Sequence, residues 1–219
     1  NFPWCPAADW ADIHAELDLA RPWRSGLRAH ARLWCDGQSP YEPFPLDQAL
    51  PLLEWGVNYQ LARRMNDHVL LHAGALERDG FALVMPAVPG SGKSTLTAAL
   101  SLRGWRLLSD EFGAYDLQAG ALRPVIKPVG LKNQSIDIIR AFDARAELGP
   151  SFPNTRKGTV AHMAPSRLAV EQRHAAVPPA AIVLPRWLEG QATQLEPLTP
   201  QMAFSSLAFN AFNYMIAGA

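Results

Sequence analysis

Several features that would assign this chain of 219 residues to particular protein classes are missing from its sequence. It has two cysteines, Cys5 and Cys35, and no C-x-x-C pair, which excludes a disulfide framework and the usual spacing of zinc ligands. No run of about 18 apolar residues occurs, so we expect no membrane-spanning helix. The formal net charge is zero, so we do not expect a broad nucleic-acid surface. No signal peptide is visible, and we expect a cytoplasmic protein.

The composition is that of a folded protein, because 48% of the residues are hydrophobic. Prolines interrupt residues 1–45, where we expect a small and irregular N-terminal subdomain. One strand is predicted there, within residues 27–38, ending at an Asp36-Gly37 turn. Residues 46–219 are expected to form one larger α/β domain, without internal repeats.

The hydrophobic pattern of residues 46–219 predicts alternating helices and short strands. Two apolar runs flank Arg78-Asp79-Gly80, which is typical of a β-hairpin. Thr199-Pro200 is a favourable helix start. Apolar periodicity and turn residues predict helices at about 46–65, 94–103, 135–142 and 200–215, strands within 105–111, 159–163 and 180–185, and a loop at 150–157.

The second run of the hairpin leads into a glycine-rich loop with the sequence PGSGKST. It matches the phosphate-loop pattern G-x-x-x-x-G-K-[ST], except that Ala87 stands at the first glycine position. Gly90 and Gly92 still let backbone N–H groups turn towards an anion, and the loop opens a helix, whose N-terminus favours phosphate. We therefore expect nucleotide binding. The expected phosphate contacts come from Pro89, Gly90, Ser91, Gly92, Lys93, Ser94 and Thr95, with Ser94 also a ligand of Mg²⁺.

Two acids, Asp110 and Glu111, follow the helix after the loop and one short apolar run. One interpretation is that of an ATPase, in which Asp110 holds the metal ion through water and Glu111 positions a hydrolytic water. The other makes Asp110 the general base that faces an acceptor hydroxyl. The short spacing from Lys93 favours the second interpretation, since many ATPases place the second acid further along the chain. Solvation of a strand end by two acids is the unspecific alternative.

His72 lies in the first strand of the predicted hairpin, in the run LLHAGA. A single histidine in an apolar strand is more often a core residue with satisfied hydrogen bonds. Here, however, the hairpin would bring His72 near the glycine loop and the acids. We therefore predict a catalytic role for His72 beside Asp110 and Lys93.

The run from His72 to Glu111 resembles the catalytic domain of HPr kinase/phosphorylase, which is similar in fold to phosphoenolpyruvate carboxykinase. The segments LLEWGVNYQLA, GWRLLSDE, VGLKNQSIDIIR, TRKGTVAHM and FNYM narrow the resemblance to the group called HprK-related kinase A, over about residues 40–216. It implies a mixed sheet carrying the phosphate loop, with ATP and Mg²⁺ as cofactors. It also implies that Asp110 is the general base, that Glu111 helps to hold the metal ion with Asp110 and Ser94, and that His72 lies near the catalytic acid.

The sequence departs from HPr kinases downstream of the acids. It lacks their glycine-rich signature with a metal-binding glutamate and their basic substrate segment. The resemblance therefore implies a serine of a peptide or protein other than HPr as acceptor, in association with a PqqD-like peptide chaperone. A homo-oligomer, an ATPase-like regulator and a small-molecule hydroxyl kinase stay open. Candidate anion-binding residues in the replacement segments, with solvated loop charges as the alternative, are Lys132, Asn133, Arg156 and Lys157.

Overall fold

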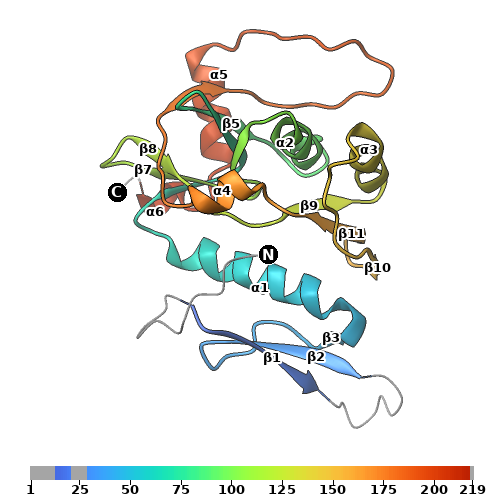
Figure 1. Ribbon diagram of the computed structural model, residues 1–219. Coiled ribbons are helices and arrows are strands. Elements are labelled where there is room, and N and C mark those ends of the chain that lie inside the picture. The colour runs from blue at the N-terminus through green and yellow to red at the C-terminus, as the bar shows by residue number, and fades with distance from the viewer. Residues whose placement is uncertain (1–12, 21–28, 218–219) are drawn as a thin grey trace. The chain divides into compact units, whose positions relative to one another are not determined.

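The computed structural model describes residues 13–20 and 29–217, which form a mixed α/β structure with three sheets (Figure 1). The strands are β1 (Ala15–Ala20), β2 (His30–Cys35), β3 (Phe44–Pro45), β4 (Val69–Arg78), β5 (Phe81–Pro86), β6 (Arg106–Ser109), β7 (Phe112–Asp116), β8 (Ala121–Arg123), β9 (Val129–Lys132), β10 (Phe152–Thr155), β11 (Gly158–Met163) and β12 (Pro179–Ile182). The helices are α1 (Ala49–Arg64), α2 (Lys93–Leu102), α3 (Gln134–Phe142), α4 (Arg167–Glu171), α5 (Pro200–Phe209) and α6 (Tyr214–Ala217), with a 3-10 turn, η1, at Leu46–Gln48. Within the described ranges, no helix is long and apolar enough to cross a membrane.

The chain divides into two compact units. The first comprises Asn1–Met65 with Ser151–Val160, and the second comprises Asn66–Pro150 with Ala161–Ala219. The sheet order β1-β2-β3 belongs to the first unit, and the order β12-β5-β4-β7-β8, with β6 also paired to β4, belongs to the second. A third sheet has the order β10-β11-β9, and the boundary between the units falls within β11.

The first unit contains more regular structure than the sequence predicts. Strand β2 and helix α1 are confirmed, but β1 pairs with β2 along its full length, from Ala15 opposite Cys35 to Ala20 opposite His30. The prediction that this region is irregular apart from β2 is therefore wrong for β1 and β3. Helix α1 and the sheet share an apolar core, in which Cys35 is buried and unpaired; Cys5 lies outside the described residues.

Strand β10 occupies part of the segment that the sequence predicts as a loop, residues 150–157. It pairs antiparallel with β11, but only Phe152 with Val160 and Thr155 with Gly158 stand opposite each other. The backbone of Asn154 has a φ of 58°, which interrupts the register between these two pairs. The loop prediction is wrong here because a tight turn joins two strands, and the Thr155 hydroxyl closes this turn by donating to Gly158 O at 2.7 Å.

The six-stranded sheet of the second unit confirms the hairpin predicted at Arg78-Asp79-Gly80. Strands β4 and β5 pair antiparallel from Ala73 opposite Pro86 to Arg78 opposite Phe81. The two turn residues have positive φ, 55° for Asp79 and 83° for Gly80, as a two-residue hairpin turn requires. Helix α2 and strand β6 follow as predicted, and Gly104, with a φ of 92°, ends the helix.

Strand β4 separates two apolar cores because its side chains alternate between the faces of the sheet. Leu71, Ala73 and Ala75 enter a core with β5, and Leu207 of α5 packs against that core. Gly74 faces the other side, where a Cβ would lie 2.4 Å from Thr97 of α2. A separate core forms among α2, α3, α4, β6, β9 and β11. Figure 1 shows α2 and α3 side by side.

Helix α5 begins as predicted, with Thr199 as N-cap accepting a hydrogen bond from Met202 N. The prediction that it continues to Met215 is wrong, because it ends at Phe209 and the chain turns back onto β4. Asn213 fixes this turn, since its Oδ1 accepts from Leu70 N at 2.9 Å and its Nδ2 donates to His68 O at 2.7 Å. None of the apolar side chains of α5 is fully buried, although Leu207 is partly buried against the core of β4 and β5.

Arg106 of β6 is expected to be a major contributor to the stability of the second unit. Its side chain is 4% exposed, its Nε donates to Glu77 Oε2 at 2.8 Å, and its Nη1 donates to the carbonyls of Gln172 and Ala175. Replacing one partner of a buried ion pair leaves the other charge and its acceptors unpaired. Arg106→Met should therefore lower the free energy of unfolding by about 3 kcal/mol, measured by urea denaturation.

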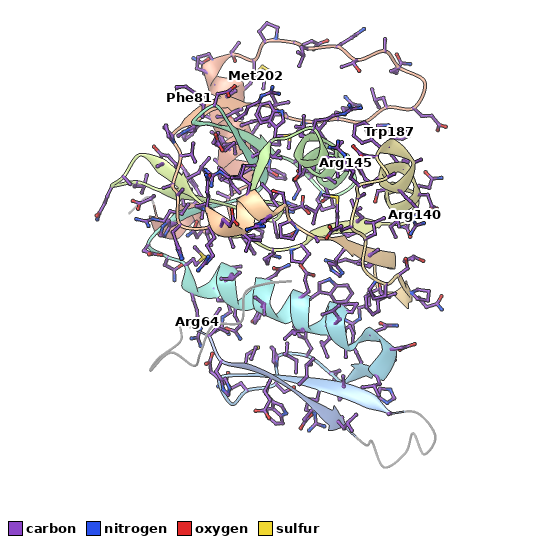
Figure 2. All side chains as sticks on the ribbon, viewed as in Figure 1. Arg64, Phe81, Arg140, Arg145, Trp187 and Met202 are labelled. Atoms are coloured by element: carbon purple, nitrogen blue, oxygen red, sulfur yellow. The ribbon has the colours of Figure 1, made fainter. Side chains whose placement is uncertain are left out.

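The matched control for this change is Arg140→Met on α3. The Arg140–Asp137 pair is 2.8 Å long, but its side chains are 59% and 81% exposed (Figure 2). Water replaces such a pair easily, so the control should change the free energy of unfolding by under about 0.5 kcal/mol. Equal effects of the two variants would contradict a special role for the buried pair.

Candidate active site

The central strand β4 brings the glycine loop and the acids together at residues 72–74. On one edge, Ala73 stands opposite Pro86, the last residue of β5, and Ala87 N donates to His72 O at 3.3 Å. On the other edge, β6 pairs with β4, and β7 pairs with it from His72 opposite Phe112. The acids occupy the two-residue step between β6 and β7. The loop and the acids are therefore attached to opposite edges of β4 at residues 72–74.

The glycine loop has the backbone that the sequence predicts. Gly90 and Gly92 have φ values of 89° and 88°, in the region that favours glycine, and Gly92 caps the N-terminus of α2. Ser91 N donates to Val88 O at 3.3 Å, which closes a turn around Gly90. Ala87 has no positive φ and is 6% exposed, so this position needs a small buried side chain rather than glycine.

The side chains of the loop divide into an exposed entry and a buried end. Pro89 and Gly90 are exposed, whereas Ser91, Ser94 and Thr95 are partly buried. Lys93 is 6% exposed, and its Nζ donates to the backbone oxygen of Asp110. The lysine predicted to contact phosphate is thus held at the start of α2, where the helix dipole also favours an anion.

Asp110 has a buried carboxyl group with one oxygen that lacks a hydrogen-bond partner among the described residues. It is 7% exposed, and its Oδ2 accepts a hydrogen bond from Gly130 N at 3.3 Å. Among the described residues, its buried Oδ1 has no hydrogen-bond partner. Burial raises the pKa of the Asp110 carboxyl and Glu111 adds to this rise, while Lys93, Ser94 and Lys127 act in the opposite direction. A buried acceptor that no protein donor satisfies is a place for a ligand, a metal ion or a transferred proton.

Glu111 points towards His72 and is more accessible than Asp110. The Glu111 side chain is 34% exposed and the His72 side chain is 20% exposed, and His72 Nε2 lies 3.7 Å from Glu111 Oε1. Ser109 Oγ accepts from Glu111 N at 3.3 Å and from Phe112 N at 3.0 Å, which fixes the bend that carries both acids. His72 also packs edge-on against the ring of Phe212, with 5.6 Å between ring centroids. The structure therefore brings His72 to Glu111.

Two further groups reach Asp110 that sequence reasoning misses, Lys127 and the backbone N–H of Gly130. Lys127 comes from the proline-broken stretch that leads into β9 and Gly130 comes from β9 itself, and Lys127 Nζ lies 5.9 Å from the centre of the Phe112 ring. The sequence instead predicts Lys132, the last residue of β9, as an anion-binding residue. Lys127 lies between Pro124 and Pro128 in a segment without a periodic pattern, so only the three-dimensional structure shows that it acts on Asp110.

The remaining predicted substrate residues belong to different units. Lys132 and Asn133 are exposed at the start of α3, where Lys132 N donates to Ser135 Oγ at 2.7 Å and Asn133 has a φ of 51°. Arg156 and Lys157 belong to the first unit. There the Arg156 guanidinium lies 5.0 Å from the centre of the Phe44 ring, and Lys157 Nζ lies 4.9 Å from that of Trp55. A substrate role for these four residues stays a prediction.

A metal ion at this site would need ligands from a bound substrate in addition to those from the protein. Among the described residues, no group of three or more His, Cys, Asp or Glu side chains could hold a metal ion. The Ser94 hydroxyl acts on the Asp110 carboxyl as a hydrogen-bond donor, and Asp110 Oδ1 lacks a partner in the described chain. Mg²⁺ usually takes one or two protein oxygens and completes its shell with phosphate oxygens and water, which fits this donor set.

Comparison of the chain with protein-family models, with curated proteins and with solved structures finds no match in any of the three. The chemistry of the site therefore follows from its own residues. They combine a glycine loop at a helix N-terminus, a buried lysine, and a buried carboxyl group with an open oxygen. This combination suits the binding of a phosphate chain and the acceptance of a proton beside it.

Gly74 sets how closely α2 can approach β4, and we expect Gly74→Ala to disturb the site. The new Cβ would lie 2.4 Å from Thr97 Oγ1 and 3.5 Å from Lys93 Cγ. Thr97 is fully buried and branched at Cβ, so either its side chain or α2 has to shift. The variant should lose about 1–3 kcal/mol of unfolding free energy, measured by thermal denaturation, and should bind ATP more weakly in calorimetry.

The double variant Gly74→Ala, Thr97→Ala separates this clash from other effects. Thr97 Oγ1 has no hydrogen-bond partner among the described residues, so Thr97→Ala breaks no hydrogen bond and frees the space for the new methyl group. The double variant should recover most of the lost stability, as expected for two residues in contact. Strictly additive losses would contradict the predicted clash.

Proposed function

We propose that this chain is an ATP- and Mg²⁺-dependent phosphotransferase related to HPr kinase, which transfers the γ-phosphoryl group to a serine of a peptide or protein other than HPr. The observation that carries the proposal is Asp110, a 7% exposed carboxyl group with an open Oδ1 beside Lys93 and Ser94 of the glycine loop. A structural carboxylate at such depth would have its oxygens satisfied by the protein.

The phosphate-binding role falls to the loop and the start of α2. Backbone N–H groups of residues 90–95 would hold the phosphate oxygens, and Lys93 would lie along the β- and γ-phosphates. When bound, Mg²⁺ neutralises charge on these phosphates, with Ser94, Asp110 and Glu111 as the protein groups that would hold it. Lys127, which acts on Asp110 from the segment before β9, would add a further positive charge.

The transfer step assigned to this chain uses Asp110 as general base. The acceptor hydroxyl forms a bond to the γ-phosphorus, and the bond between this phosphorus and the bridging oxygen of ADP breaks. The hydroxyl proton passes to Asp110, and ADP leaves with the bonding electron pair. A pKa raised by burial makes the carboxylate a stronger base than an exposed aspartate. His72, 3.7 Å from Glu111, would orient that second acid.

The acceptor can be identified by the fate of the γ-phosphoryl group. We would incubate the protein with ATP labelled in the γ-position, Mg²⁺, a pool of serine-containing peptides with and without a PqqD-like chaperone, and a separate pool of metabolites. We expect acid-stable label on peptide serine. Label confined to a low-mass hydroxyl compound would instead identify a small-molecule kinase.

The same experiment separates a kinase from an ATPase-like regulator. Glu111 is more exposed than Asp110, which would suit the positioning of a water molecule. In a regulator, label appears only as inorganic phosphate, no peptide changes its release, and Glu111→Gln abolishes it. In the proposed kinase, Glu111→Gln lowers transfer to the acceptor.

A further inference from the structure

The segment that joins β12 to α5 runs past the glycine loop and carries an exposed tryptophan. Val183 N donates to Val84 O at 2.9 Å, which continues the pairing of β12 with β5. Four residues later, Trp187 N donates to Ser91 O at 3.0 Å. The Trp187 side chain is 63% exposed, and Figure 2 shows it on this segment. The backbone contact therefore fixes a large aromatic side chain at the loop while leaving its ring in solvent.

Trp187 lies directly against Gly92, the N-cap of α2. A Cβ placed on Gly92 would be 3.1 Å from Trp187 Cβ, and the positive φ of Gly92 already favours glycine there. Leu96, one helical turn after Gly92 on the same face, is 37% exposed. Two apolar side chains are thus exposed next to a helix N-terminus suited to phosphate. Covering exposed aromatic surface with a ligand lowers the free energy, so these side chains are candidates for a ligand contact.

We propose that Trp187 is the nucleobase-binding residue of this site and stacks on the base of the bound nucleoside triphosphate. The inference rests on the proposed function, since it requires the phosphate chain to lie on the loop. Lys93, whose Nζ donates to the backbone oxygen of Asp110, would then lie at the γ-phosphate end of that chain. The base would extend from the other end, and Trp187 and Leu96 offer it an exposed apolar surface beside Gly92.

The indole offers a ring face rather than a set of hydrogen bonds, so stacking on it should not select one particular base. Every base has a π-face, and stacking on an aromatic side chain tolerates changes of base. Stacking of this kind typically contributes about 10- to 100-fold to affinity. ATP and GTP should therefore both depend on Trp187, and a ligand without a base should not.

Calorimetry with two ligands tests the proposal. Each protein is titrated with ATP·Mg²⁺ and with inorganic tripolyphosphate·Mg²⁺, which has the phosphates but no base. Trp187→Ala should weaken ATP binding about 10-fold or more and leave tripolyphosphate binding unchanged, whereas Trp187→Phe should retain most of the ATP affinity. The matched control is Phe81→Ala, which removes a 57% exposed aromatic ring at the β4–β5 hairpin and should change neither titration.

The outcomes separate this inference from the proposed function. If the wild-type protein binds neither ligand, both are overturned. If the wild-type protein binds both and Trp187→Ala loses neither, or loses both equally, the stacking role is wrong while phosphate binding stands. If Trp187→Ala keeps its ATP affinity but needs more peptide for half-maximal transfer, Trp187 contacts the acceptor and the base assignment is overturned.

Discussion

Asp110→Asn is expected to lower the rate of γ-phosphoryl transfer by about 10²- to 10⁴-fold and to leave the affinity for ATP little changed. Asparagine keeps the size of the side chain and can still accept the hydrogen bond from Gly130 N through its oxygen. The backbone oxygen that holds Lys93 is also unaffected. The substitution therefore removes the proton acceptor while keeping the loop, Lys93 and a side-chain oxygen that can still face Mg²⁺.

The stability of this variant gives an independent indication of the same role. Burial raises the pKa of Asp110 in the folded chain, so the ionised carboxyl group is less favourable there than in the unfolded chain at neutral pH. Asparagine removes that cost, and the variant should unfold at the same temperature as the wild-type protein or a higher one. The control is Asp137→Asn on the exposed face of α3, which should change neither rate nor stability. Full transfer activity in Asp110→Asn would show that another group accepts the proton.

Lys93→Met is expected to weaken ATP binding by about 10-fold or more and to lower transfer by about 10²- to 10³-fold. Methionine has a flexible, unbranched side chain that can fill the buried space, but it carries no charge. Lys93 is 6% exposed and begins α2, so its ammonium acts in surroundings where water screens it little. The lysine should therefore contribute to binding as well as to the transfer step.

Calorimetry with ATP·Mg²⁺ measures the first effect, and circular dichroism checks that the variant is folded. Arg167→Met removes a positive charge from a side chain that is 91% exposed on α4 and is the matched control, with no expected change in ATP affinity. An unchanged ATP affinity in Lys93→Met would contradict the phosphate-binding role of the loop.

The parts of the fold that the sequence predicts well are those with local causes. Asp79 and Gly80 have the positive φ values that a two-residue hairpin turn needs, and Gly90 and Gly92 adopt the same region in the loop. The start of α5 at Thr199 is equally local, because one side chain caps one backbone N–H. Residue type alone decides these features, since neighbouring residues in the chain form them.

The parts that the sequence misses depend on hydrogen bonds between distant segments. Helix α5 has no proline or glycine to end it, yet the chain turns after Phe209 because Asn213 bonds to both Leu70 and His68 of the β4 region. Strand β10 contains Pro153 and a left-handed Asn154, so its residues read as a loop. Pairing with β11 overrides that local preference.

The candidate site shows the same division. The loop, the acids and His72 are recognisable from their order along the chain, and the hairpin explains why His72 and the loop are neighbours. The contribution of Lys127 and of the Gly130 N–H to Asp110 depends on how β9 and the segment before it lie in the fold. Nothing in the spacing of these residues distinguishes Lys127 from Lys132.

The central claim is that the loop at Gly90–Thr95 and Asp110 together form an ATP site, and a crystal structure with Mg²⁺ and a non-hydrolysable ATP analogue tests it most directly. We predict the triphosphate on the backbone N–H groups of the loop, with Mg²⁺ between the phosphates, the Ser94 hydroxyl and Asp110. A well-ordered nucleotide bound elsewhere on the chain, with the loop empty and Asp110 Oδ1 still without a partner, would contradict the account.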